Sequence, residues 1–314
     1  MTTWLPNAVV DHLRVVATWP ELPGDRYLID RPIGRGGMGT VYVARDTLLD
    51  RDVALKVSNA PVAGAGLDER LRQEAQVLAR LEHPGIVPVH DAGLLADGRL
   101  FYVMKLVHGE TLTTHVARLP GEAAVLGVFE RVAETMAFAH DAGVVHRDLK
   151  PSNVMVGRFG EVLVLDWGVA KVLEADALAG TRVGTPGFMS PEQSRAESAT
   201  GTASDVFALG ALLFWMLTGE TPGIRPQEGL RRIRAARRLT AIAVKCLASD
   251  AAQRYVRAGD LAADLARYRA GQPVTAHRET ALERFGQWFI KYRTFILLVA
   301  AYLVMRAMFA FFRS

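Results

Sequence analysis

The chain has 314 residues, half of them hydrophobic, and a formal net charge of +4. This length suffices for two domains, or for one two-lobed domain with a sizeable core. The single cysteine, Cys246, excludes an internal disulfide framework and fits a reducing compartment. Five arginines between positions 231 and 238 have the spacing of a solvated helix face, so we expect no nucleic-acid partner.

The first 25 residues form an N-terminal extension. Polar and charged residues at positions 11, 12 and 14 separate its apolar pairs, which argues against a signal peptide. We expect a short amphipathic helix that ends before Pro20, without an assigned role.

A glycine-rich turn follows at Ile33–Val41, with the sequence IGRGGMGTV. Its glycines let backbone N–H groups approach phosphate oxygens, because no side chain stands in the way. Dinucleotide-binding folds share such glycines but need a helix directly after them. The strand-like segment Val41–Ala44 follows instead, so the pattern favours a phosphate-binding β-hairpin.

The next candidate is Lys56, in a segment that alternates like a strand, Val53–Val57. Beyond it, apolar residues recur at helical spacing: Leu67, Leu71, Ala75 and Leu78. Glu74 falls on the same stripe, where an unpaired carboxylate is costly. We therefore predict that Glu74 pairs with Lys56. A further strand is expected at Phe101–Met104, and a helix at Gly121–Ala142.

The segment Val144–Gly168 has the sequence VVHRDLKPSNVMVGRFGEVLVLDWG. Two short apolar runs on either side of a turn at Gly157–Gly160 predict a β-hairpin. The hairpin brings Asn153, before its first strand, close to Asp166, after its second. Two oxygen donors held this close suit Mg²⁺, which takes few protein oxygens and leaves room for phosphate. Asp148 precedes them and is placed to receive a proton.

Taken in order, these motifs resemble those of protein kinases, with Trp167 where the family usually has phenylalanine. A lone His-Arg-Asp carries little information. HRDLKPSN followed by Asp-Trp-Gly, with Asp166 thirteen residues after Asn153, is specific. Lys150, two places after Asp148, marks the serine/threonine form. The chain is similar to bacterial Hanks-type (eukaryotic-like) serine/threonine protein kinases of the membrane-tethered kind.

The resemblance implies an α+β fold with two lobes, covering residues 26–271. The β-rich N-lobe is expected at about 26–107 and the helical C-lobe at about 108–271, with ATP and Mg²⁺ in the cleft between them. The implied reaction transfers the γ-phosphoryl group of ATP to a serine or threonine hydroxyl of a protein substrate.

The same resemblance implies a role for each catalytic residue. Asp148 would accept or orient the hydroxyl proton, and Lys150 would steady the γ-phosphate. Asn153 and Asp166 would hold Mg²⁺. Lys56, with its predicted glutamate partner, would hold the α- and β-phosphates.

The resemblance also implies an ATP pocket, closed at the back by Met104. Its expected residues are Ile33, Gly34, Arg35, Gly36, Gly37, Met38, Gly39, Val41, Ala54, Lys56, Met104, Lys105, Val107 and Met155. The family often has an acid where Lys105 stands, but backbone groups of this hinge would bind adenine. Val41, Ala54 and Met155 would sandwich the base, although each also fits an ordinary core position.

The segment GTPGFMSPE, Gly184–Glu192, resembles the family's activation-segment motif and leaves two phosphosite candidates. Thr181 is predicted to be autophosphorylated, because Arg147 could pair with a phosphate there. Thr185 is expected to contact the catalytic aspartate and lysine instead. Two structural contacts are also implied: Asp205 with the His-Arg-Asp backbone, and Glu192 with Arg254. The region between Gly219 and Ile242 is shorter than in most kinases, so the resemblance does not predict the substrate-docking surface.

Residues 295–312 are nearly all apolar, with one charge at Arg306. As a helix they would span about 27 Å, close to the thickness of a bilayer core. The aromatic residues Trp288 and Tyr292 and an excess of basic residues precede them. We predict a single-pass helix in the inner membrane, joined by the linker 272–294 to a cytoplasmic kinase domain. An interfacial helix, or one packed on the kinase, remains the alternative.

The main functional alternative is a pseudokinase that acts as a nucleotide-binding scaffold. A small-molecule phosphotransferase is a third reading, which the intact Gly184–Glu192 segment disfavours. For an active kinase, a homodimer that supports trans-autophosphorylation is a further expectation.

Overall fold

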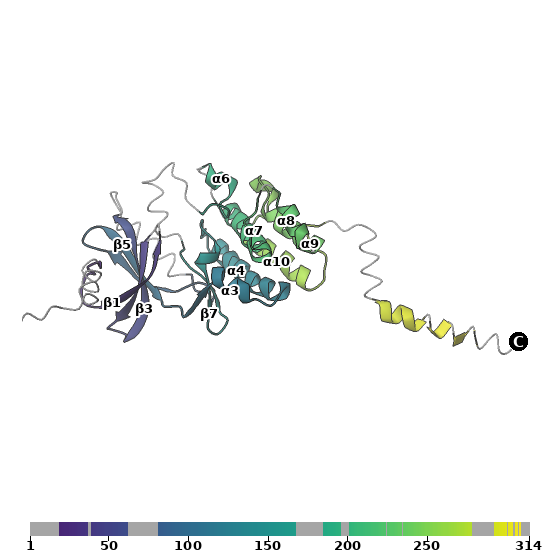
Figure 1. Ribbon diagram of the computed structural model, residues 1–314, viewed down its shortest axis with the longest axis horizontal. Coiled ribbons are helices and arrows are strands. Elements are labelled where there is room, and N and C mark those ends of the chain that lie inside the picture. The colour runs from purple at the N-terminus through teal and green to yellow at the C-terminus, as the bar shows by residue number, and fades with distance from the viewer. Residues whose placement is uncertain are drawn as a thin grey trace, which may run out of the picture.

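The computed structural model describes residues 19–36, 39–61, 81–167, 185–195, 201–223, 225–233, 235–277, 292–299, 301–303, 305–306 and 308. Within these ranges the chain forms a β-rich lobe followed by a helical lobe, as Figure 1 shows. The two-lobed arrangement is the predicted one. Glu74, Thr181 and the tip of the glycine-rich turn lie outside the described residues.

The N-lobe is a five-stranded antiparallel sheet with the order β1-β2-β3-β5-β4. Its strands are β1 (Tyr27–Gly36), β2 (Gly39–Asp46), β3 (Arg51–Pro61), β4 (Val89–Leu94) and β5 (Arg99–Lys105). Alternating side chains divide between two faces. One face buries a core that includes Leu55 and Val103, and the other, which carries Ala54 and Met104, packs with Leu163 of the C-lobe.

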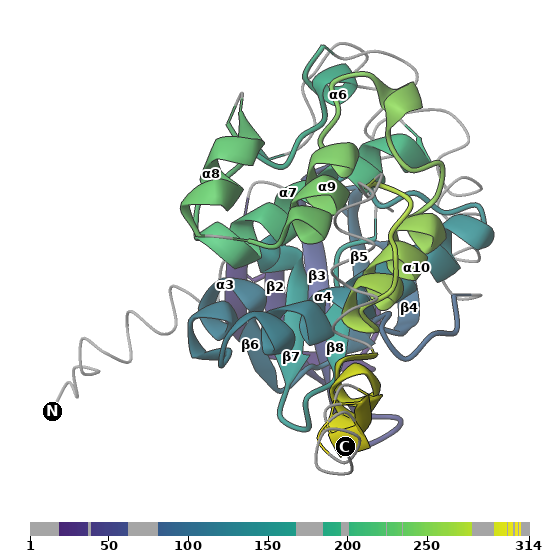
Figure 2. The same ribbon diagram turned by 90° about the vertical axis from the view of Figure 1, so that its right-hand side faces the viewer.

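The C-lobe is built around α4 (Glu122–Asp141) and α7 (Thr202–Thr218), which pack on each other. Fully buried side chains such as Phe129 and Leu212 fill the core between them. Two further helices, α9 (Arg237–Cys246) and α10 (Ala258–Arg269), cover them, as Figure 2 shows from the end of the molecule. The shorter elements are α3 (Leu112–His115), α6 (Pro191–Ser194), α8 (Pro226–Arg232) and 3₁₀ turns at Val116–Arg118, Pro151–Asn153 and Ala251–Gln253.

A small sheet near the lobe boundary carries the predicted hairpin. Its strands are β6 (Gly109–Thr111), β7 (Val154–Gly157) and β8 (Val162–Val164), in that order across the sheet. Val154 pairs with Val164, and Gly160 turns the chain with a φ of 80°, a conformation that glycine adopts at no steric cost. The hairpin and the predicted helix at 121–142 are both confirmed.

A buried ion pair joins distant parts of the C-lobe. Glu192, in α6, accepts from the Arg254 guanidinium through both carboxylate oxygens, at 2.7 and 2.9 Å. Ser204 donates to the same carboxylate at 2.8 Å. Although burial opposes ionisation, these hydrogen bonds lower the pKa of Glu192 to about 2. The contact predicted between Glu192 and Arg254 is therefore confirmed.

The C-terminal residues 292–299 and 301–303 are helical and lie apart from both lobes (Figure 1). Within the described part of the chain, no helix is both long enough and apolar enough to cross a membrane. The expected spanning helix at 295–312 is thus not found there, and several of its residues fall outside the described ranges.

Candidate active site

The loop His146–Asn153 is held in place by Asp205 of α7. One oxygen of this buried carboxylate accepts the backbone N–H of His146 at 2.8 Å, and the other accepts that of Arg147 at 2.8 Å. His140 of α4 lies 2.9 Å from the first oxygen. Arg147 adopts a φ of 67°, a left-handed conformation that non-glycine residues rarely take. The predicted contact of Asp205 with this loop is confirmed, and it fixes the backbone that carries Asp148.

Asp148 is surrounded by polar groups from its own loop and from the segment before α6. Lys150 Nζ lies 3.1 Å from its Oδ2. Thr185 Oγ1 lies 3.4 Å from its Oδ1 and accepts from Lys150 Nζ at 2.8 Å. Asn153 Nδ2 donates to the Asp148 backbone oxygen at 2.8 Å. A buried acid is therefore bordered by an ammonium group and a hydroxyl, an arrangement in which it can take a proton from a hydroxyl substrate.

Asn153 and Asp166 lie at the two ends of the β7–β8 hairpin, as predicted. The backbone of Leu165 donates to Asn153 O at 2.8 Å, which brings the two ends together. The N–H₂ group of the Asn153 side chain donates to the Asp148 backbone oxygen, so the Asn153 amide oxygen is the group available to a cation. Asp166 adopts a φ of 58°, again in the left-handed region.

Among the described residues, no group of three or more histidine, cysteine or acidic side chains could hold a metal. One carboxylate and one amide oxygen instead suit Mg²⁺, which binds through one or two carboxylates and completes its shell with substrate phosphates and water. The residues at this site fit that ion.

Lys56 of β3 reaches Asp166 across the lobe boundary, with Nζ 2.6 Å from Oδ1. Burial disfavours its charged form, but interactions with Tyr102 and Asp166 outweigh that effect and raise the pKa of Lys56 above its ordinary value. The ammonium therefore stays charged at neutral pH. Its other predicted partner, Glu74, lies outside the described residues.

Trp167 is anchored more firmly than the usual phenylalanine could be. Its indole N–H donates to Val164 O at 3.0 Å, and its ring meets His146 edge to face at 4.9 Å. His146 in turn lies 2.8 Å from Leu165 O. The sequence marked Trp167 as a departure from the family pattern. Phenylalanine could not donate the hydrogen bond that the indole makes. This bond depends on how the ring packs, which could not be predicted from the sequence.

The expected ATP-binding residues lie on the N-lobe sheet, on β7, in the glycine-rich turn and at the hinge. Val41, Ala54 and Met104 share the cleft face of the N-lobe sheet. Met155 lies on β7 below them, paired with Thr111. Gly39 packs tightly on β3, because a Cβ there would lie 2.3 Å from Val57 O.

The remaining positions lie along the glycine-rich turn and the hinge. Gly36 pairs with Gly39 where β1 turns into β2. The turn also includes Ile33, Gly34 and Arg35, which are exposed on β1. Lys105 ends β5 with an exposed side chain, and its backbone N–H donates to Pro88 O at 3.1 Å.

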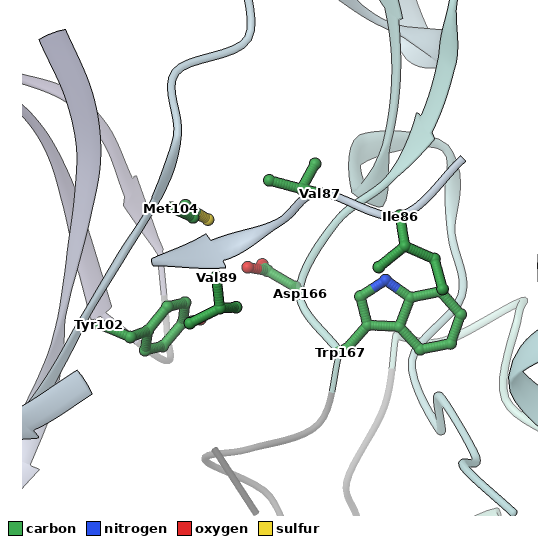
Figure 3. A pocket seen from close by; sticks show the side chains of 7 residues that line it. All are labelled: Ile86, Val87, Val89, Tyr102, Met104, Asp166 and Trp167. Atoms are coloured by element: carbon green, nitrogen blue, oxygen red, sulfur yellow. The ribbon is translucent and has the colours of Figure 1, made fainter. Parts of the chain in front are cut away.

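A cavity of about 20 Å³ lies behind Asp166 and is shown in Figure 3. Its walls are Ile86, Val87, Val89, Tyr102, Met104, Asp166 and Trp167. Sequence reasoning placed Met104 here but did not single out Tyr102. A signal was available, because Tyr102 lies two residues before Met104 and so projects from the same face of the strand.

Comparisons with known proteins agree with this geometry. The family model "protein kinase domain" matches residues 27–276, and the chain belongs to the protein kinase domain family. It is 36% identical over 285 residues to serine/threonine-protein kinase PknB of Mycobacterium leprae, covering 82% of this chain and 45% of that protein. It is 33% identical over 295 residues to serine/threonine-protein kinase PknD of Chlamydia caviae, covering 79% and 32%.

Among solved structures, the chain resembles the PknI kinase domain of Mycobacterium tuberculosis. The TM-score is 0.63 and the sequence identity 29%, over 78% of this chain and 96% of that domain. The chain spans less than half the length of the curated relatives named above.

Proposed function

We propose that the chain is a serine/threonine protein kinase that transfers the γ-phosphoryl group of ATP to hydroxyl groups of protein substrates. The observation that carries the proposal is the contact of Asp148 and Lys150, on the same loop as Asn153, with Thr185 from the segment before α6. The names of the relatives and the serine/threonine form of this loop support the same activity.

In the proposed mechanism Asp148 orients the substrate hydroxyl and accepts its proton. Lys150 would place positive charge beside the transferred γ-phosphoryl group, whose oxygens carry the negative charge. Asn153 and Asp166 would hold Mg²⁺, and Lys56 is poised to contact phosphate oxygens. The bound ATP–Mg²⁺ supplies the phosphoryl group and neutralises much of its charge.

The pseudokinase alternative gains no support from these residues. Lys56, Asp148, Asn153 and Asp166 are all present, and Lys56 already contacts Asp166. The test is incubation with radiolabelled ATP, Mg²⁺ and a generic basic protein, comparing the wild type with Asp148→Asn. We expect label on the protein substrate with the wild type and at most about one hundredth of it with the variant. Equal labelling by both proteins would remove Asp148 from the mechanism.

We propose that the kinase domain covers about residues 26–271. We also propose that phosphorylation of Thr181 activates it. Arg147 has its backbone fixed by Asp205 and lies next to Asp148, so a phosphate paired with it would act on the catalytic loop. Thr185 instead hydrogen-bonds within the Asp148 cluster.

After incubation with ATP and Mg²⁺ we expect mass spectrometry to find phosphate on Thr181, and Thr181→Ala to have lower activity. If transfer occurs between two copies in a transient homodimer, the rate per molecule rises with enzyme concentration. An enzyme that is active on substrate but carries no phosphate at Thr181 contradicts this proposal.

We also propose that residues 295–312 attach the kinase to the inner membrane, with the catalytic lobes on the cytoplasmic side. The proposal is supported by a run of apolar side chains exposed on the C-terminal helix: Phe295, Leu297, Leu298, Val299, Tyr302, Leu303, Met305 and Met308. A single-pass helix is the form we favour, and the basic residues that precede it suit a cytoplasmic flank.

Membrane attachment is tested by comparing the full chain with a chain truncated after His277. Asp264 of α10 accepts the backbone N–H groups of Thr275 and Ala276 at 2.8 and 3.0 Å, so this end point keeps the last contacts of the C-lobe. We expect the full chain to stay with membranes through a high-salt wash and the truncated chain to be soluble and active. Release of the full chain by salt contradicts a spanning helix.

A further inference from the structure

Tyr102 of β5 lies directly opposite Lys56 of β3 in the antiparallel sheet. Directly opposed residues project from the same face of a sheet and lie close together. Both are buried, with 7% of Lys56 and 9% of Tyr102 exposed. Lys56 Nζ lies 5.7 Å from the centroid of the Tyr102 ring. The register of the sheet thus holds a phenol beside the ammonium group that is expected to bind phosphate.

Tyr102 also lies beside the partner of Lys56. It lines the same cavity as Asp166, and in Figure 3 the Asp166 carboxylate points away from Trp167, toward the side that carries Tyr102. Because Lys56 Nζ and Asp166 Oδ1 are 2.6 Å apart, the Lys56 ammonium lies beside the carboxylate that lines this cavity together with Tyr102. Burial, with contributions from Asp166, raises the pKa of Tyr102 to about 12 despite the opposing effect of Lys56. The phenol therefore keeps its proton at neutral pH.

The rest of the cavity wall explains why the hydroxyl matters. Its other residues are apolar: Ile86, Val87, Val89, Met104 and Trp167. A buried tyrosine hydroxyl needs a hydrogen-bond partner, and a phenylalanine would fill the same space without that requirement. A phenol can accept an N–H from an ammonium and donate its O–H to a carboxylate. Tyr102 can therefore close a ring of three groups with Lys56 and Asp166.

We propose that Tyr102 is a positioning residue for phosphotransfer, whose hydroxyl holds the Lys56 ammonium and the Asp166 carboxylate in their mutual contact. It acts through these two side chains and does not touch the reacting atoms. Its effect on turnover rests on the proposed kinase function. The three-group contact itself is a property of the protein without nucleotide.

The test is Tyr102→Phe, which keeps the ring and removes only the hydroxyl. We expect kcat to fall about ten-fold, while the KM for ATP changes by less than about three-fold. A second readout needs no nucleotide: the rate at which an amine-reactive acylating reagent labels Lys56 at alkaline pH, followed by mass spectrometry. Loss of the hydroxyl removes one of the groups proposed to hold the Lys56 ammonium in place, so the freed side chain should be labelled several-fold faster. Lys105, exposed at the end of β5, should label at an unchanged rate.

The matched control is Tyr27→Phe. Tyr27 is a buried tyrosine of the same sheet whose hydroxyl donates to Asp91 at 2.8 Å, in a core cluster separate from that of Tyr102. This variant should lose comparable stability but keep wild-type kcat and Lys56 labelling. Wild-type kcat and labelling in Tyr102→Phe would overturn the proposal, as would equal losses of activity in both variants. If the wild type transfers no phosphate, the proposed function fails, and Lys56 labelling still decides the contact.

Discussion

Replacing Asp166 with asparagine lowers phosphotransfer by at least about two orders of magnitude while the protein stays folded. The substitution removes the carboxylate that contacts Lys56 at 2.6 Å and, with Asn153, is proposed to hold Mg²⁺. Lys56→Met, which removes the other half of the ion pair, should have a loss of the same order. The measurement is the rate of label transfer from radiolabelled ATP at saturating Mg²⁺, with circular dichroism to verify folding.

The control for this prediction is Asp97→Asn, in an exposed turn of the N-lobe. Asp97 accepts hydrogen bonds from Arg99 and lies outside the candidate active site, so the activity of the Asp97→Asn variant should match that of the wild type. Full activity in purified, folded Asp166→Asn protein would contradict the metal assignment.

Arg254→Met is expected to lower the free energy of unfolding by about 3–5 kcal/mol, because it leaves the buried Glu192 carboxylate without its counter-charge. Glu192 and Arg254 are both almost fully buried and bond through two oxygens. The double variant Glu192→Gln with Arg254→Met should recover part of this loss, since no unpaired charge remains. Urea unfolding of the wild type and the variants measures the differences.

The matched control is Arg257→Met, which removes an exposed ion pair to Asp141 with a separation of 3.5 Å. Such surface pairs contribute about 0–1 kcal/mol, so little stability should be lost. A loss in Arg254→Met no larger than that of Arg257→Met contradicts a stabilising role for the buried pair.

The Glu192–Arg254 pair also makes the stability of the fold depend on pH. Hydrogen bonding lowers the pKa of Glu192 from 4.5 to about 2 despite its burial. Because the folded state holds the proton more weakly than the unfolded state, the pair stabilises the fold above pH 4.5. This contribution disappears as the pH falls from 4.5 toward about 2. The double variant should therefore lose less stability than the wild type across that interval.

Local patterns and motif spacing predicted the elements that carry the site. The β7–β8 hairpin follows from two apolar runs and a glycine turn, so the closeness of Asn153 and Asp166 was predictable. The helix predicted at Gly121–Ala142 is found as α4, with nearly the same bounds. The contacts of Asp205 and Arg254 came from the resemblance to protein kinases, since nothing local connects residues so far apart in the chain.

Other features depend on cross-strand register and packing, which the sequence does not display. The place of Tyr102 opposite Lys56 requires the pairing of β3 with β5, two strands that are not consecutive in the chain. The Trp167 bond to Val164 requires the turn after β8. The C-terminal apolar run gave a clear pattern, but its predicted span is not found among the described residues.

Serine/threonine phosphotransfer at this site is tested most directly by identifying the amino acid that receives the phosphate. Wild-type chain is incubated with radiolabelled ATP, Mg²⁺ and a basic protein substrate, and the labelled substrate is hydrolysed and its phosphoamino acids are separated. Phosphoserine and phosphothreonine are predicted, and both should be nearly absent with Asp148→Asn. Label found only on tyrosine, only on a small molecule, or not at all would contradict the assignment of this site to serine/threonine phosphotransfer.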